Sequence, residues 1–298
     1  MSQPLTHPAR AEARVTESIP GPIRRSESHF EAASGQPLFR RSWMPRGADR
    51  IIALVHGYAE HSGRYERTAT DLARAGFEVH AYDQRGHGRS SGARCHVRRF
   101  AQLLDDLERF VALLRAERPA LPIAVVGHSM GGLLVAAYAS QRNPDVAAVA
   151  SSGAALALPE GFSRARAAAI RGARWLLPRL SLANGLDPDA LSRDPEVVRA
   201  YLEDPLVERR FTLALAGEML AAIERTARAA AAVRLPMLLM HGEADTICPV
   251  AGSRHFFEQL DAGQARLRTY PGLRHEIFNE PERDAVLGDL VSWIRELG

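Results

Sequence analysis

A serine between glycines is the first candidate for chemistry in this chain. The segment Gly127-His128-Ser129-Met130-Gly131 follows the apolar run 123–126 and precedes the apolar stretch 132–139. A strand, a G-x-S-x-G turn and a helix in this order form a nucleophile elbow, in which a strained turn exposes the serine oxygen. Bulky neighbours would obstruct such a turn, which explains the glycines. The pattern predicts that Ser129 is a nucleophile at the N-terminus of a helix.

A candidate acid and a candidate base follow the serine in the chain. Asp245 comes shortly after the apolar run 236–242, and His275 follows the predicted strand 264–270. The order Ser129, Asp245, His275, each just beyond a strand, is that of an α/β-hydrolase triad. An imidazole must take the serine proton, and a carboxylate must fix the imidazole tautomer. Glu243 is the alternative acid, and the alternative for His275 is a solvated loop histidine.

Two backbone N–H groups are predicted to form an oxyanion hole. Met130 directly follows the nucleophile, and Tyr58 lies in the loop 56–61 after the predicted strand 51–55. Donors at these two places stabilise the tetrahedral oxyanion in sites of this kind. The ring of Tyr58 is expected to pack at the mouth of the site. His128, next to the nucleophile, is predicted to support substrate binding.

Five motifs stand out along the chain: His56-Gly57-Tyr58-Ala59-Glu60-His61-Ser62-Gly63-Arg64-Tyr65, Asp83-Gln84-Arg85-Gly86-His87-Gly88-Arg89-Ser90, Gly127-His128-Ser129-Met130-Gly131-Gly132, Asp204-Pro205-Leu206-Val207 and His241-Gly242-Glu243-Ala244-Asp245. They resemble motifs of monoacylglycerol lipases, and some are shared with bacterial lysophospholipases and related esterases. The resemblance extends from about Ser26 to the C-terminus and implies an α/β-hydrolase fold. It also implies the same triad and oxyanion donors, with Glu60 and Arg64 near the glycerol end of the substrate. Two positions depart from the mammalian members: Tyr58 stands where a small residue is usual, and Phe278 replaces a histidine.

Length and composition fit one catalytic domain with an insertion. The chain has 298 residues, of which 46% are hydrophobic, enough for a substantial core. It has no apolar run of about 18 residues, so no transmembrane helix is predicted. Residues 1–25, rich in Pro, Ala, Ser and Arg, are predicted to be a disordered tail without the apolar core of a signal peptide. Two distant cysteines, Cys95 and Cys248, make no disulfide framework, and a cytoplasmic location is expected.

The charged residues exclude several other classes of function. All 38 basic residues are arginine, so neither a lysine Schiff base nor a Walker-type phosphate site is available. The net charge is only +3, and the arginines are scattered among acids, so nucleic-acid binding is not predicted.

No metal or other cofactor is predicted either. His56, Glu60 and His61 lie in a glycine-bracketed loop and not on the helix that a metal-binding H-E-x-x-H motif needs. The segment 83–90 is predicted to be a structural turn in which Asp83 and Arg85 bond neighbouring backbone, with phosphate binding as the alternative.

The order of predicted elements gives the architecture that must position these residues. Strands and helices alternate after an antiparallel hairpin, which predicts a mostly parallel sheet with helices on both faces. The predicted core comprises residues 26–153 and 233–298. The expected strands are 28–32, 38–43, 51–55, 78–82, 123–126 and 146–151, and the expected helices 65–75, 100–117 and 282–297.

Residues 154–232 have helical spacing without a convincing strand and are predicted to form a cap inserted into the core. One helix there is predicted to place apolar residues opposite its arginines. We expect that apolar face to pack on the core, with the arginines in solvent. The alternative is a basic amphipathic helix on a lipid surface that admits an acyl chain. A second helix, 211–231, should be largely buried. The apolar face comprises Phe162, Ala165, Ala169, Ala173 and Leu176, and the opposite face Arg164, Arg171 and Arg174.

Together these features predict a serine ester hydrolase that cleaves monoacylglycerols or similar single-chain lipid esters through an acyl-enzyme. A lysophospholipase or a broad carboxylesterase is the alternative. A non-catalytic binding protein with the same fold is the competing class. The expected partners are a small lipid ester and, transiently through the cap, a membrane surface.

Overall fold

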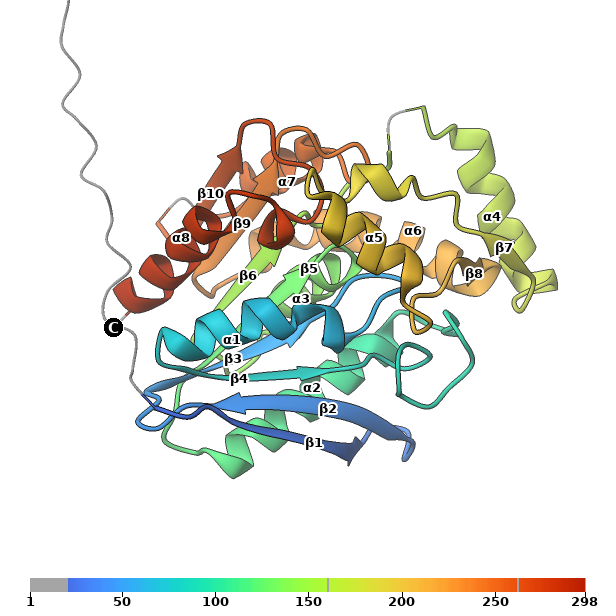
Figure 1. Cartoon of the computed structure of the whole chain (residues 1–298). Helices are drawn as coiled ribbons and strands as arrows, with labels where there is room; N and C mark the ends of the chain where they lie inside the picture. The colour runs from blue at the N-terminus through green and yellow to red at the C-terminus, as the bar shows by residue number, and fades with distance from the viewer. Residues whose placement is uncertain (1–20, 160, 262, 298) are drawn as a thin grey trace, which may run out of the picture.

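The computed structural model describes residues 21–159, 161–261 and 263–297. Within them, eight strands form one sheet in the order β1-β2-β4-β3-β5-β6-β9-β10 (Figure 1). The hairpin β1–β2 lies at one edge, and β1–β2 and β2–β4 pair in an antiparallel manner. All neighbouring strands from β4 through β10 in this order are parallel. The strands are β1 Arg24–Glu31, β2 Pro37–Met44, β3 Arg50–Val55, β4 Phe77–Tyr82, β5 Ile123–His128, β6 Ala148–Ser152, β9 Met237–Gly242 and β10 Ala265–Tyr270.

Helices cover both faces of the sheet, because successive strand residues point to opposite sides. In β3, Ile51 and Ala53 face one apolar core, and Ile52 and Leu54 face the other. The first core includes side chains of α2 (Ala101–Glu117), α3 (Met130–Arg142) and α7 (Val250–Phe257). The second includes those of α1 (Glu66–Arg74) and α8 (Arg283–Glu296). The predicted α/β architecture is therefore confirmed.

The segment between β6 and β9 lies beyond the carboxyl ends of the parallel strands (Figure 1). Its described residues hold three α-helices, α4 (Arg164–Leu176), α5 (Pro195–Glu203) and α6 (Leu213–Arg228). It also holds a short antiparallel pair, β7 (Ser181–Ala183) with β8 (Arg210–Thr212). The expectation of no strand here was wrong, because three-residue strands are too short to leave an alternating pattern. The prediction of a largely buried second helix was right in part: half of the residues of α6 are buried, and its C-terminal turns expose Glu224, Arg225 and Arg228.

The predicted orientation of α4 was also wrong. Ala165, Ala169 and Leu176 are exposed, although they were assigned to the packed face. Two arginines assigned to solvent instead face α6. Arg171 pairs with Glu224, and Arg174 pairs with Glu218. The acids lie about 50 residues away in sequence, so the local hydrophobic pattern could not indicate which side of the helix packs.

Other predictions were right in part. Residues 1–20 of the predicted tail lie outside the described residues, but Arg24 and Arg25 already belong to β1. Asp83 accepts backbone N–H groups from Ser62 and Arg89, as expected for a structural turn. Among the described residues, the Arg85 side chain bonds no neighbouring backbone and instead forms a buried ion pair with Asp106. In the described ranges, none of the helices is long and apolar enough to cross a membrane.

Candidate active site

Ser129 lies between β5 and α3 in a backbone conformation that few residues adopt. Its φ is 55° and its ψ is −116°, a strained combination for a residue with a side chain. Its N–H donates to the Ser152 carbonyl at 2.9 Å, which anchors the turn. A Cβ on Gly131 would lie 2.2 Å from the Val55 carbonyl oxygen, so only glycine allows α3 to approach β3. The turn leaves Ser129 partly exposed among buried neighbours.

Asp245 lies in the loop after β9, and its carboxylate is fully engaged. Oδ1 accepts backbone N–H groups from Ile247 at 2.9 Å and Cys248 at 2.8 Å. Oδ2 lies 2.7 Å from His275 Nδ1 and 3.1 Å from His241 Nε2. Burial alone would raise the pKa of Asp245, but the two histidines outweigh burial and hold that pKa far below its usual range.

His275 is buried, and its Nδ1–H donates to Asp245. This bond fixes the tautomer and leaves Nε2, on the other side of the ring, to act as a base. Burial would lower the pKa of His275, but the charge of Asp245 raises it above its usual value. Glu243, the alternative acid, is exposed and instead bonds Arg254 and Thr269. The geometry therefore favours Asp245 as the acid.

The two predicted oxyanion donors are both close to Ser129. Met130 is the first residue of α3, and Tyr58 follows Gly57, whose Cβ position would be 3.1 Å from Ser129 Cβ. Within the described part of the chain, neither the Tyr58 nor the Met130 N–H donates to a protein acceptor. Both N–H groups thus remain available to a ligand.

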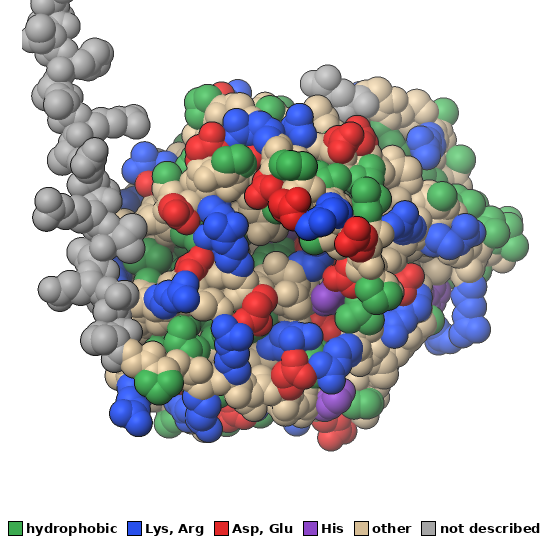
Figure 2. Space-filling model, in the orientation of Figure 1, with side chains coloured by type: hydrophobic (Ala, Val, Ile, Leu, Met, Phe, Trp, Pro, Cys, Tyr) green, Lys and Arg blue, Asp and Glu red, His purple; other side chains and the backbone are tan. Residues whose placement is uncertain are grey.

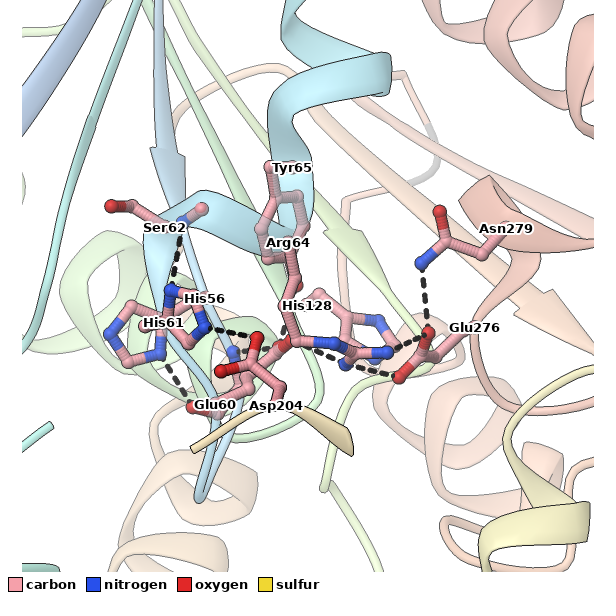
Figure 3. Close-up of polar contacts among 12 residues, drawn as sticks. His56, Glu60, His61, Ser62, Arg64, Tyr65, His128, Asp204, Glu276 and Asn279 are labelled. Carbon is pink, nitrogen blue, oxygen red and sulfur yellow. Dashed lines mark hydrogen bonds and ion pairs between the residues drawn. The ribbon is translucent and has the colours of Figure 1, made fainter. Parts of the chain in front are cut away.

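A buried polar network holds the loop that carries Tyr58 (Figure 3). Glu60 Oε1 accepts from Gly57 N at 2.6 Å and from the Tyr65 hydroxyl at 2.7 Å, and Oε2 accepts from Arg64 at 2.8 Å. Arg64 also binds both oxygens of Glu276, at 2.6 and 2.9 Å. The predicted substrate-binding pair Glu60 and Arg64 is thus brought together, and its polar atoms are engaged with protein groups.

His128 lies beside the base, with ring centroids 4.6 Å apart. Its Nδ1–H donates to the Ser152 carbonyl at 3.0 Å, which leaves Nε2 as an acceptor. Burial and the neighbouring His275 lower the pKa of His128 to about 4. The ring is therefore neutral near pH 7 and offers a hydrogen-bond acceptor rather than a charge.

An apolar cavity of about 230 Å³ lies between the cap and the core. Cys248, whose thiol lies beside the Ser129 side chain, lines it together with Tyr58. The cavity therefore extends to a residue that contacts Ser129, and its apolar lining suits a hydrocarbon chain. Its other apolar walls come from the cap and from Ile247: they include Leu158, Phe162, Ile170, Leu186, Phe211, Leu215, Met219, Leu220 and Ile223.

The histidines of the predicted oxyanion loop are occupied by protein partners. His56 Nδ1–H donates to the Gly57 carbonyl, and its Nε2 accepts from Gln84 N. His61 Nε2 lies 2.8 Å from Asp204 of the cap. Among the described residues, no cluster of three His, Cys, Asp or Glu side chains could hold a metal ion. The loop histidines therefore act in hydrogen bonding.

Comparison with known proteins places this geometry in a family. A model of the family described as serine aminopeptidase, S33, matches residues 46–282. The chain belongs to this family of α/β-hydrolases. The hydrolase is 40% identical over 272 residues to the monoacylglycerol lipase of Mycolicibacterium smegmatis, covering 91% of this chain and 97% of that one.

Two further relatives support the predicted resemblance. The monoglyceride lipase of Homo sapiens is 34% identical to the hydrolase over 288 residues, covering 95% and 94% of the two chains. The crystal structure of Paleococcus ferrophilus monoacylglycerol lipase superposes with a TM-score of 0.77 at 32% identity. It covers 93% of this chain and 100% of that chain. The resemblance to monoacylglycerol lipases is therefore confirmed.

Some residues of the site were not singled out from the sequence. His241, named only as part of a motif, is the second histidine on Asp245. Glu276 directly follows His275 and binds Arg64, yet no local signal distinguished it from other acids. Asp204 was noted only as part of a motif, and its pairing with His61 ties the cap to the oxyanion loop.

The raised pKa of His275 predicts the pH dependence of the reaction. A general base must be neutral, so kcat/KM should fall as the pH drops through this pKa. Because Asp245 raises it, the midpoint should lie above the ordinary histidine value of about 6.5. A pH profile of kcat/KM with a soluble ester, together with NMR titration of the imidazole, measures it. A midpoint below the ordinary value would contradict this electrostatic account.

The position of Cys248 predicts slow inactivation by maleimides. Its thiol is buried next to Ser129, and burial and the charge of Asp245 raise its pKa well above the usual range. Little thiolate is present, so alkylation should be slow and should accelerate as the pH rises. Inactivation by N-ethylmaleimide should be lost in Cys248→Ala and should persist in Cys95→Ala, the matched buried thiol. Equal sensitivity of Cys248→Ala and the parent would show that alkylation blocks another position.

Proposed function

We propose that the hydrolase cleaves monoacylglycerols or similar single-chain lipid esters to a fatty acid and an alcohol. The observation that carries the proposal is Ser129 on a strained turn, with its side chain beside Cys248 of an apolar cavity, together with the buried Asp245–His275 pair. The names of the relatives agree with this substrate class. The reaction type is carboxylic ester hydrolysis without a cofactor.

In the proposed mechanism, Ser129 Oγ attacks the ester carbonyl while His275 Nε2 takes the proton of the Ser129 hydroxyl. Asp245 stabilises the imidazolium that forms, and the Tyr58 and Met130 N–H groups bind the oxyanion. The tetrahedral intermediate collapses, and His275 returns the proton to the leaving alcohol. Water, deprotonated by the same imidazole, then attacks the acyl-enzyme and releases the fatty acid.

We assign the two ends of the substrate to the two sides of Ser129. The alcohol end would lie near Glu60, Arg64 and His128, where polar groups gather. The acyl chain would fill the apolar cavity under the cap. Phe278, which stands where mammalian relatives are expected to have a histidine, is buried in the apolar core. It offers the alcohol no hydrogen bond.

The cap is also proposed to touch a membrane surface while a substrate enters. Trp175 is 75% exposed and Leu176 is 83% exposed, at the end of the helix that helps to line the cavity. Large apolar side chains are seldom left in water without a partner. A cytoplasmic location is part of the proposal and is supported by the two free thiols, Cys95 and Cys248.

The triad assignment predicts a graded loss of activity. Ser129→Ala should lower turnover by roughly 10⁶-fold with the fold intact, and fluorophosphonate labelling should disappear. Asp245→Asn should lower it on the order of 10⁴-fold, because the imidazole adopts the wrong tautomer. The control is Glu243→Gln, expected to resemble the parent. If a fluorophosphonate failed to label the parent, the result would favour a binding protein. If Glu243→Gln lost activity and Asp245→Asn kept it, the acid would be Glu243.

The acyl cavity predicts dependence on chain length. Each buried methylene contributes up to about 0.8 kcal/mol, so kcat/KM should rise severalfold per CH₂ until the cavity is full. Met219→Trp should move the plateau to shorter chains because Met219 lines the cavity. Leu202→Trp, on the exposed side of α5, is the matched control. The assay is a panel of monoacylglycerols, lysophospholipids and nitrophenyl esters; flat rates from acetyl to lauroyl would indicate a general esterase.

A further inference from the structure

A second pocket, of about 330 Å³, lies at the end of the cap and is lined by basic side chains. It is separate from the apolar cavity and shares no lining residue with it. We call it the arginine pocket. Its residues are His96, Arg98, Arg174, Trp175, Pro178, Arg179, Ala214 and Glu218.

The arginine pocket carries positive charge that the protein does not neutralise. Its one acid, Glu218, is taken: Oε1 pairs with Arg174 at 2.8 Å, and Oε2 accepts from Phe100 N at 2.8 Å. Within the described residues, neither Arg98 nor Arg179 forms an ion pair with a carboxylate. Two guanidinium groups therefore face the pocket with free donors.

His96, which also lines the pocket, lies in the field of these charges. Burial lowers the pKa of His96, and the positive charges of Arg179 and Arg98 lower it further. A group whose protonation is disfavoured by two neighbouring cations lies in a field that attracts anions. Bidentate guanidinium donors suit the oxygens of a phosphate.

Exposed apolar side chains continue directly from the arginine pocket. Trp175 lines the pocket, and the guanidinium of Arg174 lies over its ring, 4.9 Å from the centroid. Figure 2 shows hydrophobic and arginine side chains side by side at the end of the molecule where α4 and β7 lie. We call the exposed residues the apolar ridge: they are Trp175, Leu176, Leu177, Leu180 and Leu182. Cations beside an aromatic and aliphatic ridge match the boundary between lipid headgroups and acyl chains.

We propose that the arginine pocket binds the phosphate of an anionic phospholipid while the apolar ridge enters the outer layer of the bilayer. The proposal rests on the membrane contact proposed above and adds a choice of lipid to it. Anionic bilayers are favoured because their phosphates can pair with Arg98 and Arg179. In a zwitterionic lipid, the phosphate is already balanced by the cation of the same headgroup. Ile170 lies on α4, as Trp175 and Leu176 do, and Phe162 lies just before this helix. Both Ile170 and Phe162 line the acyl cavity, so docking brings that cavity to the membrane.

The test measures partition of the full chain onto two kinds of vesicle by co-sedimentation. One kind is phosphatidylcholine alone, and the other has part of it replaced by phosphatidylglycerol. The parent should prefer the anionic vesicles, and Arg98→Gln/Arg179→Gln should lose this preference by on the order of 30-fold. Binding of that variant to neutral vesicles should stay as in the parent. Leu176→Ser/Leu177→Ser should bind both kinds more weakly.

The matched control is Arg67→Gln/Arg109→Gln, which removes the same charge from exposed positions on α1 and α2. It should keep most of the anionic preference. An equal loss in this control would reduce the effect to net charge and overturn the pocket. Thermal unfolding and hydrolysis of a soluble ester, measured in parallel, show that each variant is folded with its triad assembled.

The remaining outcomes separate this proposal from the ones on which it rests. Equal binding of the parent to both vesicles overturns the headgroup pocket alone, and binding to neither overturns the membrane contact as well. The parent could instead bind inorganic phosphate tightly, lose this binding in Arg98→Gln/Arg179→Gln, and show no preference between the vesicles. The site would then be one for free phosphate, and the headgroup proposal would be overturned. Soluble ester hydrolysis reports the proposed esterase function independently of all three.

Discussion

The carboxylate of Asp245 is the group on which the rest of the site depends. It is buried and takes two backbone N–H groups on Oδ1 and two imidazoles on Oδ2. An unpaired carboxylate at this depth would be strongly unfavourable, so the loop after β9 cannot shift without leaving it unsatisfied. The same bonds set the tautomer of His275 and direct its Nε2 away from the acid. The loop geometry, the pKa of the base and the orientation of the base thus share one cause.

A second constraint joins the cap to the oxyanion loop. Ala59 has a φ of 64°, an unfavourable conformation that needs support from outside the loop. The cap supplies it: Glu208 N–H donates to the Ala59 carbonyl at 2.8 Å, and Asp204 pairs with His61. Tyr58 lies directly beside Ala59, so its N–H is held in place partly by the cap. The cap therefore takes part in forming the site as well as covering it.

The sequence predicted what is local and missed what depends on distant partners. The turn at Ser129 could be predicted because its strand, glycine turn and helix are contiguous in sequence, and the parallel sheet followed from the alternation of elements. The sequence could not indicate which face of α4 packs, because Arg174 is oriented by Glu218 on another helix, α6. Glu276 was missed for the same reason, since its partner Arg64 lies 212 residues away. The pairing of charges across long separations leaves no periodic pattern.

The division of the site into a polar and an apolar side has a physical consequence for the substrate. Glu60 and Arg64 form a charged pair in the loop near Ser129, whereas the cavity that Cys248 lines is mostly apolar. An ester with polar groups at both ends would leave one end desolvated without partners, and one with two long chains would place hydrocarbon among buried charges. A single chain with a compact polar alcohol meets neither cost. The asymmetry of the site therefore favours single-chain esters, and the cap sets it by supplying most of the apolar wall.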